Sequence, residues 1–341
     1  MSSAILSVAT AVPEHRLDAS EALRHLRGFW PQLEKLEEAE ATLGTRYTCE
    51  PVEQLLRRRT LDELRDSYLR HARRLAVKAG CRALEVAGVP GSSVDLVITV
   101  SCTGYLVPSL DVYMSEELGF RPDVVRLPIT ELGCSAGAAA IAAAHRHLVA
   151  FPEQKVLVVA VEVPSLNFQQ ADGSIDNLTA ALVFGDGAGA AVLGRGAGLQ
   201  VVGTASHLIP RTEHVLGFDL REGGFHVVLD RRLPRILERE LRPVVERFAA
   251  SADLREPSFY AIHAAGPRIF DTIQSALCLP PHALDASRQV FAEVGNTSSA
   301  AIFFTLEKLL AGDMDGDGLG IGIGPGISVE LMHLARRQIS G

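Results

Sequence analysis

The chain has 341 residues, enough to bury a large core, and its length alone suggests about two domains. Its 47% apolar and 22% charged content are ordinary for a soluble globular enzyme. A formal net charge of −8 argues against a generally basic nucleic-acid-binding surface. No run approaches the roughly 18 consecutive apolar residues of a membrane span, so we expect neither a nucleic-acid nor a membrane partner.

The cysteines are scattered and odd in number, without a CxxC pair or zinc-ligand spacing. They are Cys49, Cys81, Cys102, Cys134 and Cys278. This pattern predicts no disulfide framework and no metal site, and it favours a reducing compartment. The apolar start at 4–12 lacks a basic leader, so we interpret it as a first strand and expect a cytoplasmic protein.

Hydrophobic patterning along the chain predicts alternating strands and helices. Strands are expected at 4–12, 94–100, 155–163, 188–193, 258–263 and 319–324. Helices are expected at 61–87, 135–150, 233–250 and 298–310. This alternation predicts an α/β architecture. The locally basic stretch 57–78 is either a solvated helix face or a contact for an anionic substrate.

Two passages of the chain repeat each other in order. VDLVITVS, GCSAGAAAIAAA and KVLVVAVE are followed by SFYAIHAA, GNTSSAAIFFTL and GLGIGIGP. A constant offset of 162 residues relates Ser101 to His263, Cys134 to Asn296, and Leu157 to Leu319. We therefore expect a duplicated fold with halves at 1–195 and 196–341, and a site where they meet.

Cys134 is the candidate nucleophile of the first half. It follows Gly133 at the start of a predicted helix of small residues, ELGCSAGAAAIAAAH. Amide N–H groups and the positive end of the helix dipole at that position predict a lowered thiol pKa. The alternative is a buried cysteine that acts as a small hydrophobic residue.

His263 and Asn296 are the candidate partners from the second half. His263 ends a predicted buried strand, where it could equally be a satisfied core histidine. Asn296 opens a predicted helix, where it could be a simple N-cap. A thiol, an imidazole and an amide at one junction form the arrangement that nucleophilic acyl transfer needs.

The order of these residues, each in a strand-turn-helix setting, resembles the thiolase-fold condensing enzymes. GIGPGISVEL is similar to the Gly-Phe-Gly-Pro-Gly loop of type III polyketide synthases, with Ile323 in place of Phe. Phe184 in LVFGDGAGAAV and Phe225 in LREGGFHVVLD match that family's two gatekeeper positions. The His-Gln-Ala-Asn run of β-ketoacyl-acyl-carrier-protein synthase III is absent, because Ala-Ala-Gly-Pro follows His263.

The resemblance implies a thiolase-like fold with a duplicated αβαβα architecture and a homodimer, with Val107 in a loop at the dimer interface. It also implies that malonyl-CoA and a starter acyl-CoA are substrates, with no cofactor beyond these thioesters. Cys134 would carry the growing chain, while His263 and Asn296 would stabilise the enolate of malonyl-CoA as CO2 leaves.

The family's cavity residues correspond to a further set in this chain. They are Cys102, Pro164, Asn167, Phe184, Phe218, Phe225, Gly324, Pro325 and Gly326. SCTGYLVPSL and FYAIHAAGPRI are most similar to bacterial synthases that make 1,3,6,8-tetrahydroxynaphthalene from malonyl-CoA, and Cys102 matches the additional cysteine of that subgroup. Pro164, Asn167 and the bulky Phe218 depart from the usual pattern, so the starter and the product stay open between an aromatic compound and a pyrone.

Three alternatives belong to other classes. An initiating ketosynthase would require an acyl carrier protein, and the GPG tail argues against it. A papain-type hydrolase uses the same residue types, but the flanking signature of its cysteine is missing. A non-catalytic scaffold would be expected to have lost at least one of Cys134, His263 and Asn296.

Overall fold

The computed structural model describes residues 3–28, 30, 44–221, 223–263 and 265–336. The strands are β1 (Ser3–Ala11), β2 (His15–Asp18), β3 (Thr45–Thr48), β4 (Leu96–Val100), β5 (Val125–Ile129), β6 (Val156–Glu162), β7 (Gly187–Gly194), β8 (Leu199–Leu208), β9 (Leu216–Arg221), β10 (Gly224–Leu229), β11 (Phe259–Ile262), β12 (Gly316–Gly324) and β13 (Ser328–Arg336). The helices are α1 (Ala19–Arg27), α3 (Val52–Leu55), α4 (Leu61–Ala87), α5 (Leu110–Met114), α6 (Ala136–Ala150), α7 (Ile175–Val183), α8 (Leu233–Ser251), α9 (Pro267–Leu277), α10 (Asp285–Val294) and α11 (Ala301–Leu310).

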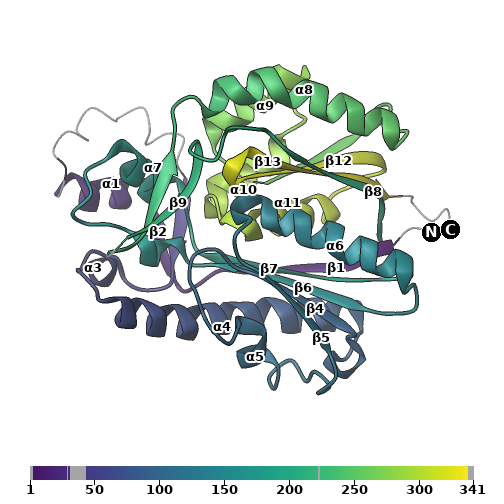
Figure 1. Cartoon of the computed structure of the whole chain (residues 1–341), viewed down its shortest axis with the longest axis horizontal. Helices are drawn as coiled ribbons and strands as arrows, with labels where there is room; N and C mark the ends of the chain where they lie inside the picture. Colours follow the sequence, from purple (N-terminus) through teal and green to yellow (C-terminus); the bar gives the residue numbers. More distant parts are fainter. Residues whose placement is uncertain (1–2, 29, 31–43, 222, 264, 337–341) are drawn as a thin grey trace.

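The elements stack in five layers (Figure 1). Helices α8 and α9 cover strands β12 and β13, and α6 and α11 form the middle layer. Below them lie β1, β4, β6 and β7, and α4 covers the outer face. The expected α/β fold with a duplicated αβαβα architecture is therefore confirmed.

The strand order makes the duplication explicit. The large sheet runs β11-β12-β13-β8-β1-β7-β6-β4-β5. On one side β4 is parallel to β6, while β7 runs antiparallel to both β6 and β1. On the other side β11 is parallel to β12, while β13 runs antiparallel to both β12 and β8. The two sets meet at a short antiparallel contact between β1 and β8, so the repeat seen in the sequence has a structural counterpart.

Local sequence signals explain where helix α4 begins and ends and why it packs closely on the sheet as an outer layer. Thr60 and Glu63 form a capping box at its start, and Gly88 ends it in the left-handed conformation. Small residues such as Ala72, Ala76 and Ala79 are buried and let the helix pack closely on β1, β6 and β7. The predicted helix at 61–87 is confirmed.

The basic stretch 57–78 spans the start of α4, and its arginines largely pair with carboxylates. The pairs include Arg59 with Glu50, Arg73 with Glu117, and Arg74 with Glu14. This pairing favours the solvated-face alternative over a substrate contact. Within the described ranges, no helix is long and apolar enough to cross a membrane.

The central helices begin later than the sequence predicted. A 3-10 turn over Gly133–Ser135 precedes α6, and another over Ser298–Ala300 precedes α11. These turns lie where the two helices approach each other most closely. A Cβ on Gly137 would lie 2.1 Å from the carbonyl oxygen of Ser299, so only glycine fits this contact. The contact brings the starts of the two central helices side by side.

Candidate active site

Two glycine turns deliver residues 134 and 296 to the junction of the halves. Gly133 has φ of 54° and Gly295 has φ of 78°, values that favour glycine. Cys134 and Asn296 each follow one of these turns, so the offset of 162 residues is preserved in the backbone geometry. A side chain at position 133 would also collide with Pro325, at 2.4 Å from its Cδ.

Cys134, His263 and Asn296 line one cavity of about 300 Å³. Phe184 and Ile323 line the same cavity, together with other apolar side chains. The structure therefore brings the three candidate catalytic residues together from both halves of the chain. A dry wall of this kind strengthens any hydrogen bond made inside it.

The Cys134 thiol lies 3.3 Å from the hydroxyl of Ser298. Burial raises the pKa of Cys134 to about 11, with a smaller contribution from the negative charge of Glu162 and against the hydrogen bond with Ser298. The expectation of a lowered thiol pKa is thus wrong, because removal from water outweighs the hydrogen bonds to the sulfur. Thiolate formation there requires a further partner.

His263 lines the same cavity as Cys134 and is held as a neutral imidazole. Its Nδ1 accepts a hydrogen bond from the backbone N–H of Ile323 at 3.4 Å. Burial lowers the pKa of His263 to about 4. Because Nδ1 is the acceptor, the neutral ring carries its proton on Nε2, which is a hydrogen-bond donor.

Asn296 is fixed by both atoms of its amide. Its Oδ1 accepts from the Ser298 backbone N–H at 2.8 Å, and its Nδ2 donates to the Ala265 carbonyl at 3.3 Å. The first bond forms an Asx turn, and because the N-cap of the following 3-10 turn is Thr297, the simple N-cap interpretation of Asn296 is not confirmed. The second uses one of two Nδ2 hydrogens, which leaves one N–H for a ligand.

Ser298 was missed by the sequence reasoning. It is buried with φ of 52°, and its Oγ lies 3.3 Å from the Cys134 Sγ and 3.5 Å from the Cys102 Sγ. This hydroxyl therefore connects the two thiols. The signal was its place in the GNTSS copy of the repeat, directly after the candidate Asn296.

Glu162 was also missed. This carboxylate is fully buried and accepts hydrogen bonds from the backbone N–H of Cys102 and from the Thr103 hydroxyl. A further bond comes from Ser299, and burial raises the pKa of Glu162. An acidic residue ending the apolar strand KVLVVAVE was the available signal.

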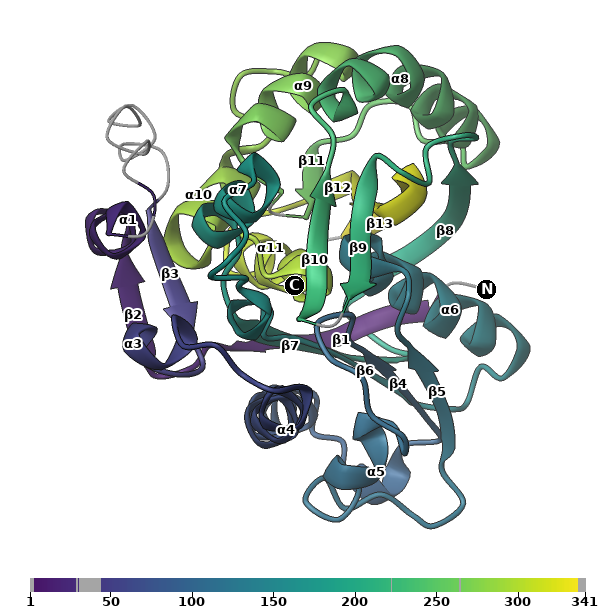
Figure 2. The ribbon, with the colours of Figure 1, turned by 60° about the vertical axis from the view of Figure 1, so that its left-hand side comes forward.

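Two further cavities adjoin the catalytic one. A cavity of about 560 Å³ is lined by Cys102, Phe218, Phe225, Pro325 and Gly326. The rings of Phe218 and Phe225 meet edge to face, 6.0 Å apart, on the β9–β10 hairpin. In Figure 2 this hairpin stands in front of the central helices. The hairpin was not predicted, because its strands are short and only partly buried.

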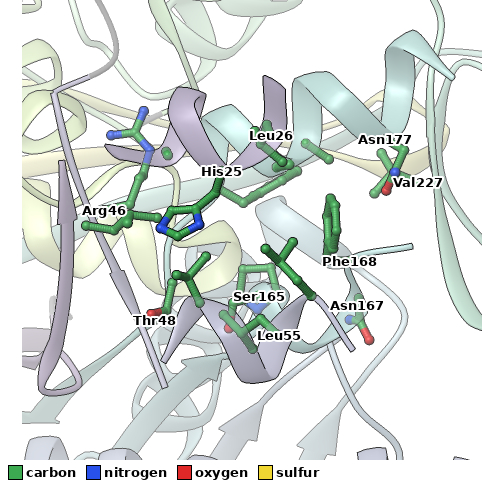
Figure 3. Close-up of a pocket in the computed structure, with 18 of the residues that line it drawn as sticks. His25, Leu26, Arg46, Thr48, Leu55, Ser165, Asn167, Phe168, Asn177 and Val227 are labelled. Atoms are coloured by element: carbon green, nitrogen blue, oxygen red, sulfur yellow. The ribbon is translucent and has the colours of Figure 1, made fainter. Parts of the chain in front are cut away.

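Pro164 and Asn167 line a smaller pocket of about 80 Å³ (Figure 3), whose walls include Phe184 and Phe218. These two aromatic side chains thus separate it from its larger neighbours.

Among the expected cavity residues, only Gly324 does not line one of these three cavities. Its φ of −141° is an extended value that any residue adopts, and it packs against Ser135, where a Cβ would lie 2.4 Å from Oγ. Among the GPG residues, Gly326 does take a left-handed φ of 61°. Glycine is therefore required at 324 by close packing and at 326 by backbone conformation.

The fold and the site fit an acyl-transferring enzyme, with Cys134 as the candidate nucleophile in a cavity between two similar sets of strands. Within the parts of the chain that the structure describes, no group of three His, Cys, Asp or Glu side chains could hold a metal ion. Comparison with known proteins narrows the class. Residues 50–197 match the N-terminal domain model, and residues 200–337 the C-terminal domain model, of the chalcone and stilbene synthases.

The chain belongs to this family, the type III polyketide synthases. It is 37% identical to 1,3,6,8-tetrahydroxynaphthalene synthase of Streptomyces coelicolor over 88% of this chain and 82% of that protein. It is 29% identical to phloroglucinol synthase of Pseudomonas fluorescens, over 87% and 88% of the two chains. The initiating-ketosynthase alternative is not favoured.

Solved structures of type III polyketide synthases have the same fold as this chain. The crystal structure of 1,3,6,8-tetrahydroxynaphthalene synthase from Streptomyces coelicolor A3(2) superposes with a TM-score of 0.93 at 34% identity, covering 98% of this chain and 99% of that one. A type III pentaketide synthase from Neurospora crassa gives 0.88 at 27% identity, covering 98% and 100%.

Proposed function

We propose that this enzyme condenses malonyl-CoA repeatedly onto a starter acyl-CoA through a thioester on Cys134 and then cyclises the chain. One observation carries this proposal: Cys134, His263 and Asn296 converge in one largely apolar cavity. The similarity to 1,3,6,8-tetrahydroxynaphthalene and phloroglucinol synthases supports an aromatic product.

In the first step the Cys134 sulfur attacks the thioester carbonyl of the starter. The Nε2–H of His263 donates a hydrogen bond to the sulfur and thereby stabilises the thiolate. The new C–S bond replaces the bond to CoA, and the proton lost from the thiol ends on the departing CoA sulfur. The free enzyme and the starter thus give acyl-Cys134 and CoA.

In the second step malonyl-CoA loses CO2. The Nε2–H of His263 and the remaining Nδ2–H of Asn296 donate to its thioester oxygen, where negative charge develops as the C–C bond breaks. The enolate carbon then attacks the acyl-Cys134 carbonyl and releases the thiolate. Transfer of the longer chain back to Cys134 starts the next round.

The substrates in this scheme are malonyl-CoA and a starter acyl-CoA, with malonyl-CoA itself as one candidate starter. We propose no cofactor beyond these thioesters, because His263 and Asn296 supply the donors that the enolate requires. The adjoining cavity with Cys102, Phe218 and Phe225 offers room for the growing chain. Pro164 and Asn167, behind Phe184 and Phe218, would act on chain length only indirectly.

We also infer a division of the chain near residue 195. β7 ends at Gly194 and β8 begins at Leu199, and the two halves contribute matching sets of strands. A homodimer is supported by the exposed apolar side chains near the β5 edge, including Val107. All five thiols are free, which supports action in the cytoplasm.

The test is incubation of the purified protein with malonyl-CoA, with and without a panel of acyl-CoA starters, followed by mass spectrometry. We expect an aromatic product from malonyl-CoA alone. A product that requires an added starter would keep the mechanism and exclude the tetrahydroxynaphthalene subgroup. Condensation only after addition of an acyl carrier protein would overturn the proposal.

A further inference from the structure

Arg46 is a buried cation that the proposed mechanism does not use. It lies in β3 and is 3% exposed. Its Nε donates to the Leu182 carbonyl at 3.0 Å, and its Nη1 donates to the Phe291 carbonyl at 3.1 Å. The guanidinium also lies over the Phe291 ring, 4.5 Å from its centroid. In Figure 3 it points away from the labelled residues of the small pocket.

The surroundings of Arg46 make its burial costly. No carboxylate forms an ion pair with it across the described ranges, and its Nη2 is buried with no hydrogen-bond partner there. Burial lowers the pKa of Arg46 to about 9, so the group is still charged at neutral pH. A buried charge without an opposite charge destabilises a fold, so a compensating role is expected.

The two carbonyls that Arg46 binds belong to the last turns of α7 and α10. Leu182 is near the end of α7, two residues before Phe184. Phe291 is in the last turn of α10, which ends just before Gly295 and Asn296. Both helices therefore end directly before residues that line the catalytic cavity.

These two chain segments are also bonded to each other. The backbone N–H of Asn296 donates to the Val183 carbonyl at 2.9 Å, and that of Gly185 donates to the Asn296 carbonyl at 3.1 Å. Gly295 packs directly on the guanidinium, since a Cβ there would lie 2.6 Å from the Arg46 Nε and 3.0 Å from its Cζ. One side chain thus bridges both segments from behind the cavity wall.

We propose that Arg46 is a positioning residue for Asn296. Its planar fork binds the carboxyl-terminal ends of α7 and α10 at once and so fixes the Gly295 turn that directs the Asn296 amide toward the cavity. A lysine ammonium is a single point charge that does not reproduce this two-sided geometry. This inference rests on the proposed function, in which Asn296 assists decarboxylation.

The test separates the two half-reactions in Arg46→Met and Arg46→Lys. Malonyl-CoA decarboxylation is followed by CO2 release, and acylation of Cys134 by the burst of CoA released from a starter. We expect kcat for decarboxylation to fall by about 10–100-fold with little change in KM, because a displacement of about 1 Å can cost ~10² in rate. Cys134 acylation should change less than about threefold, and Arg46→Lys should retain more decarboxylation than Arg46→Met.

Arg59→Met is the control, because Arg59 is a largely covered arginine that pairs with Glu50 away from the cavity wall. It should leave the ratio of the two half-reactions unchanged even if thermal stability falls. If Arg46→Met does not fold, Arg46→Lys carries the test alone. A folded Arg46 variant whose two half-reactions fall equally, or not at all, would overturn the inference.

Asn296→Ala keeps this test distinct from a test of the function itself. If Asn296→Ala decarboxylates malonyl-CoA as well as the wild-type protein, the proposed role of Asn296 fails. If Asn296→Ala is impaired while both Arg46 variants are not, the function stands and only the positioning role of Arg46 fails.

Discussion

At the scale of single residues, the proposed mechanism uses one nucleophile and two hydrogen-bond donors. In the proposed mechanism Cys134 forms the thioester, whereas His263 and Asn296 stabilise the enolate. We expect Cys134→Ala to abolish condensation while malonyl-CoA decarboxylation keeps at least a tenth of its rate, since both donors remain. Asn296→Ala should lower decarboxylation by about 10²–10³-fold, the usual effect of losing such a donor. CO2 release and product mass spectrometry measure the two activities.

Cys134→Ala and Asn296→Ala test different parts of the proposed division of roles. Equal loss of both activities in Cys134→Ala would contradict the division of roles. Ser299→Ala, which removes the hydroxyl donor to Glu162 outside the catalytic cavity, is a control for general disturbance of the middle layer.

His263 also links activity to pH through stability. Its folded-state pKa of about 4 lies below the ordinary 6.5 of histidine because burial disfavours the charged ring. The stabilisation from a neutral His263 is therefore complete above pH 6.5 and is lost as pH falls through 6.5 toward 4, where the unfolded chain binds the proton first. At about 1.4 kcal/mol per pH unit, the loss between pH 7 and pH 4 is about 3 kcal/mol.

Urea unfolding of the wild type and of His263→Gln at pH 7 and pH 4 tests this linkage. Other acidic groups titrate in both proteins, so the difference between the two pH dependences isolates His263. We expect His263→Gln to lose about 3 kcal/mol less of its unfolding free energy than the wild type does over this range. Parallel curves for the two proteins would contradict the burial effect.

At the scale of elements, the site depends on how closely α6 approaches the turn before α11. A Cβ at position 137 would lie 2.1 Å from the Ser299 carbonyl, which is backbone and cannot move aside independently. We expect Gly137→Ala to lower the unfolding free energy by about 1–3 kcal/mol, as overpacking does, and to reduce condensation at least tenfold by separating Cys134 from Asn296. Urea unfolding and product formation measure the two effects.

Gly80→Ala in α4 is the matched control for that change. A Cβ there would first meet the flexible Leu118 side chain at 3.1 Å, and alanine is the better helix former. We expect unchanged condensation and a stability within about 1 kcal/mol of the wild type. If Gly137→Ala behaves like this control, then the close approach of the two elements does not set the site geometry.

Sequence periodicity could predict the elements that form buried layers. The strands at β4, β6, β7, β11 and β12 and the helices α4, α6, α8 and α11 have continuous apolar runs or clear helical faces, and the 162-residue offset related one set to the other. The β9–β10 hairpin was not predicted, because partly buried strands of six residues have a weak hydrophobic periodicity. The start of α11 was placed three residues early because the 3-10 turn before it has the same small-residue composition as a helix start, whereas the start of α6 differs by one residue only.

Sequence patterns could likewise predict only part of the candidate site. Cys134, His263 and Asn296 could be found because the repeat aligned them at element ends. Arg46 could not be found, because its role comes from long-range contacts such as that with Phe291, and Glu162 was missed although it ends the apolar strand β6. The thiol pKa of Cys134 was predicted with the wrong sign because desolvation is a property of the folded cavity.

At the scale of the whole molecule, the proposed active site combines Cys134 from the first part of the chain with His263 and Asn296 from the second. One edge of the large sheet has no neighbouring strand among the described residues. β5 is its last strand, with Val125 57% and Leu127 41% exposed, and the nearby loop exposes Tyr105 and Val107 at 65% and 79%. An unpaired strand edge beside apolar side chains is a surface that a second protein chain can cover.

We expect a second copy of this chain to cover that edge, so Leu127→Lys should convert a dimer into a monomer by placing a charge in an apolar contact. Light scattering of the purified protein measures the mass directly. Val86→Lys, which alters an exposed apolar residue of α4, should leave the mass at twice 36.6 kDa. A wild-type mass of one chain at micromolar concentration would contradict the homodimer. A dimer that persists in Leu127→Lys would instead move the interface away from β5.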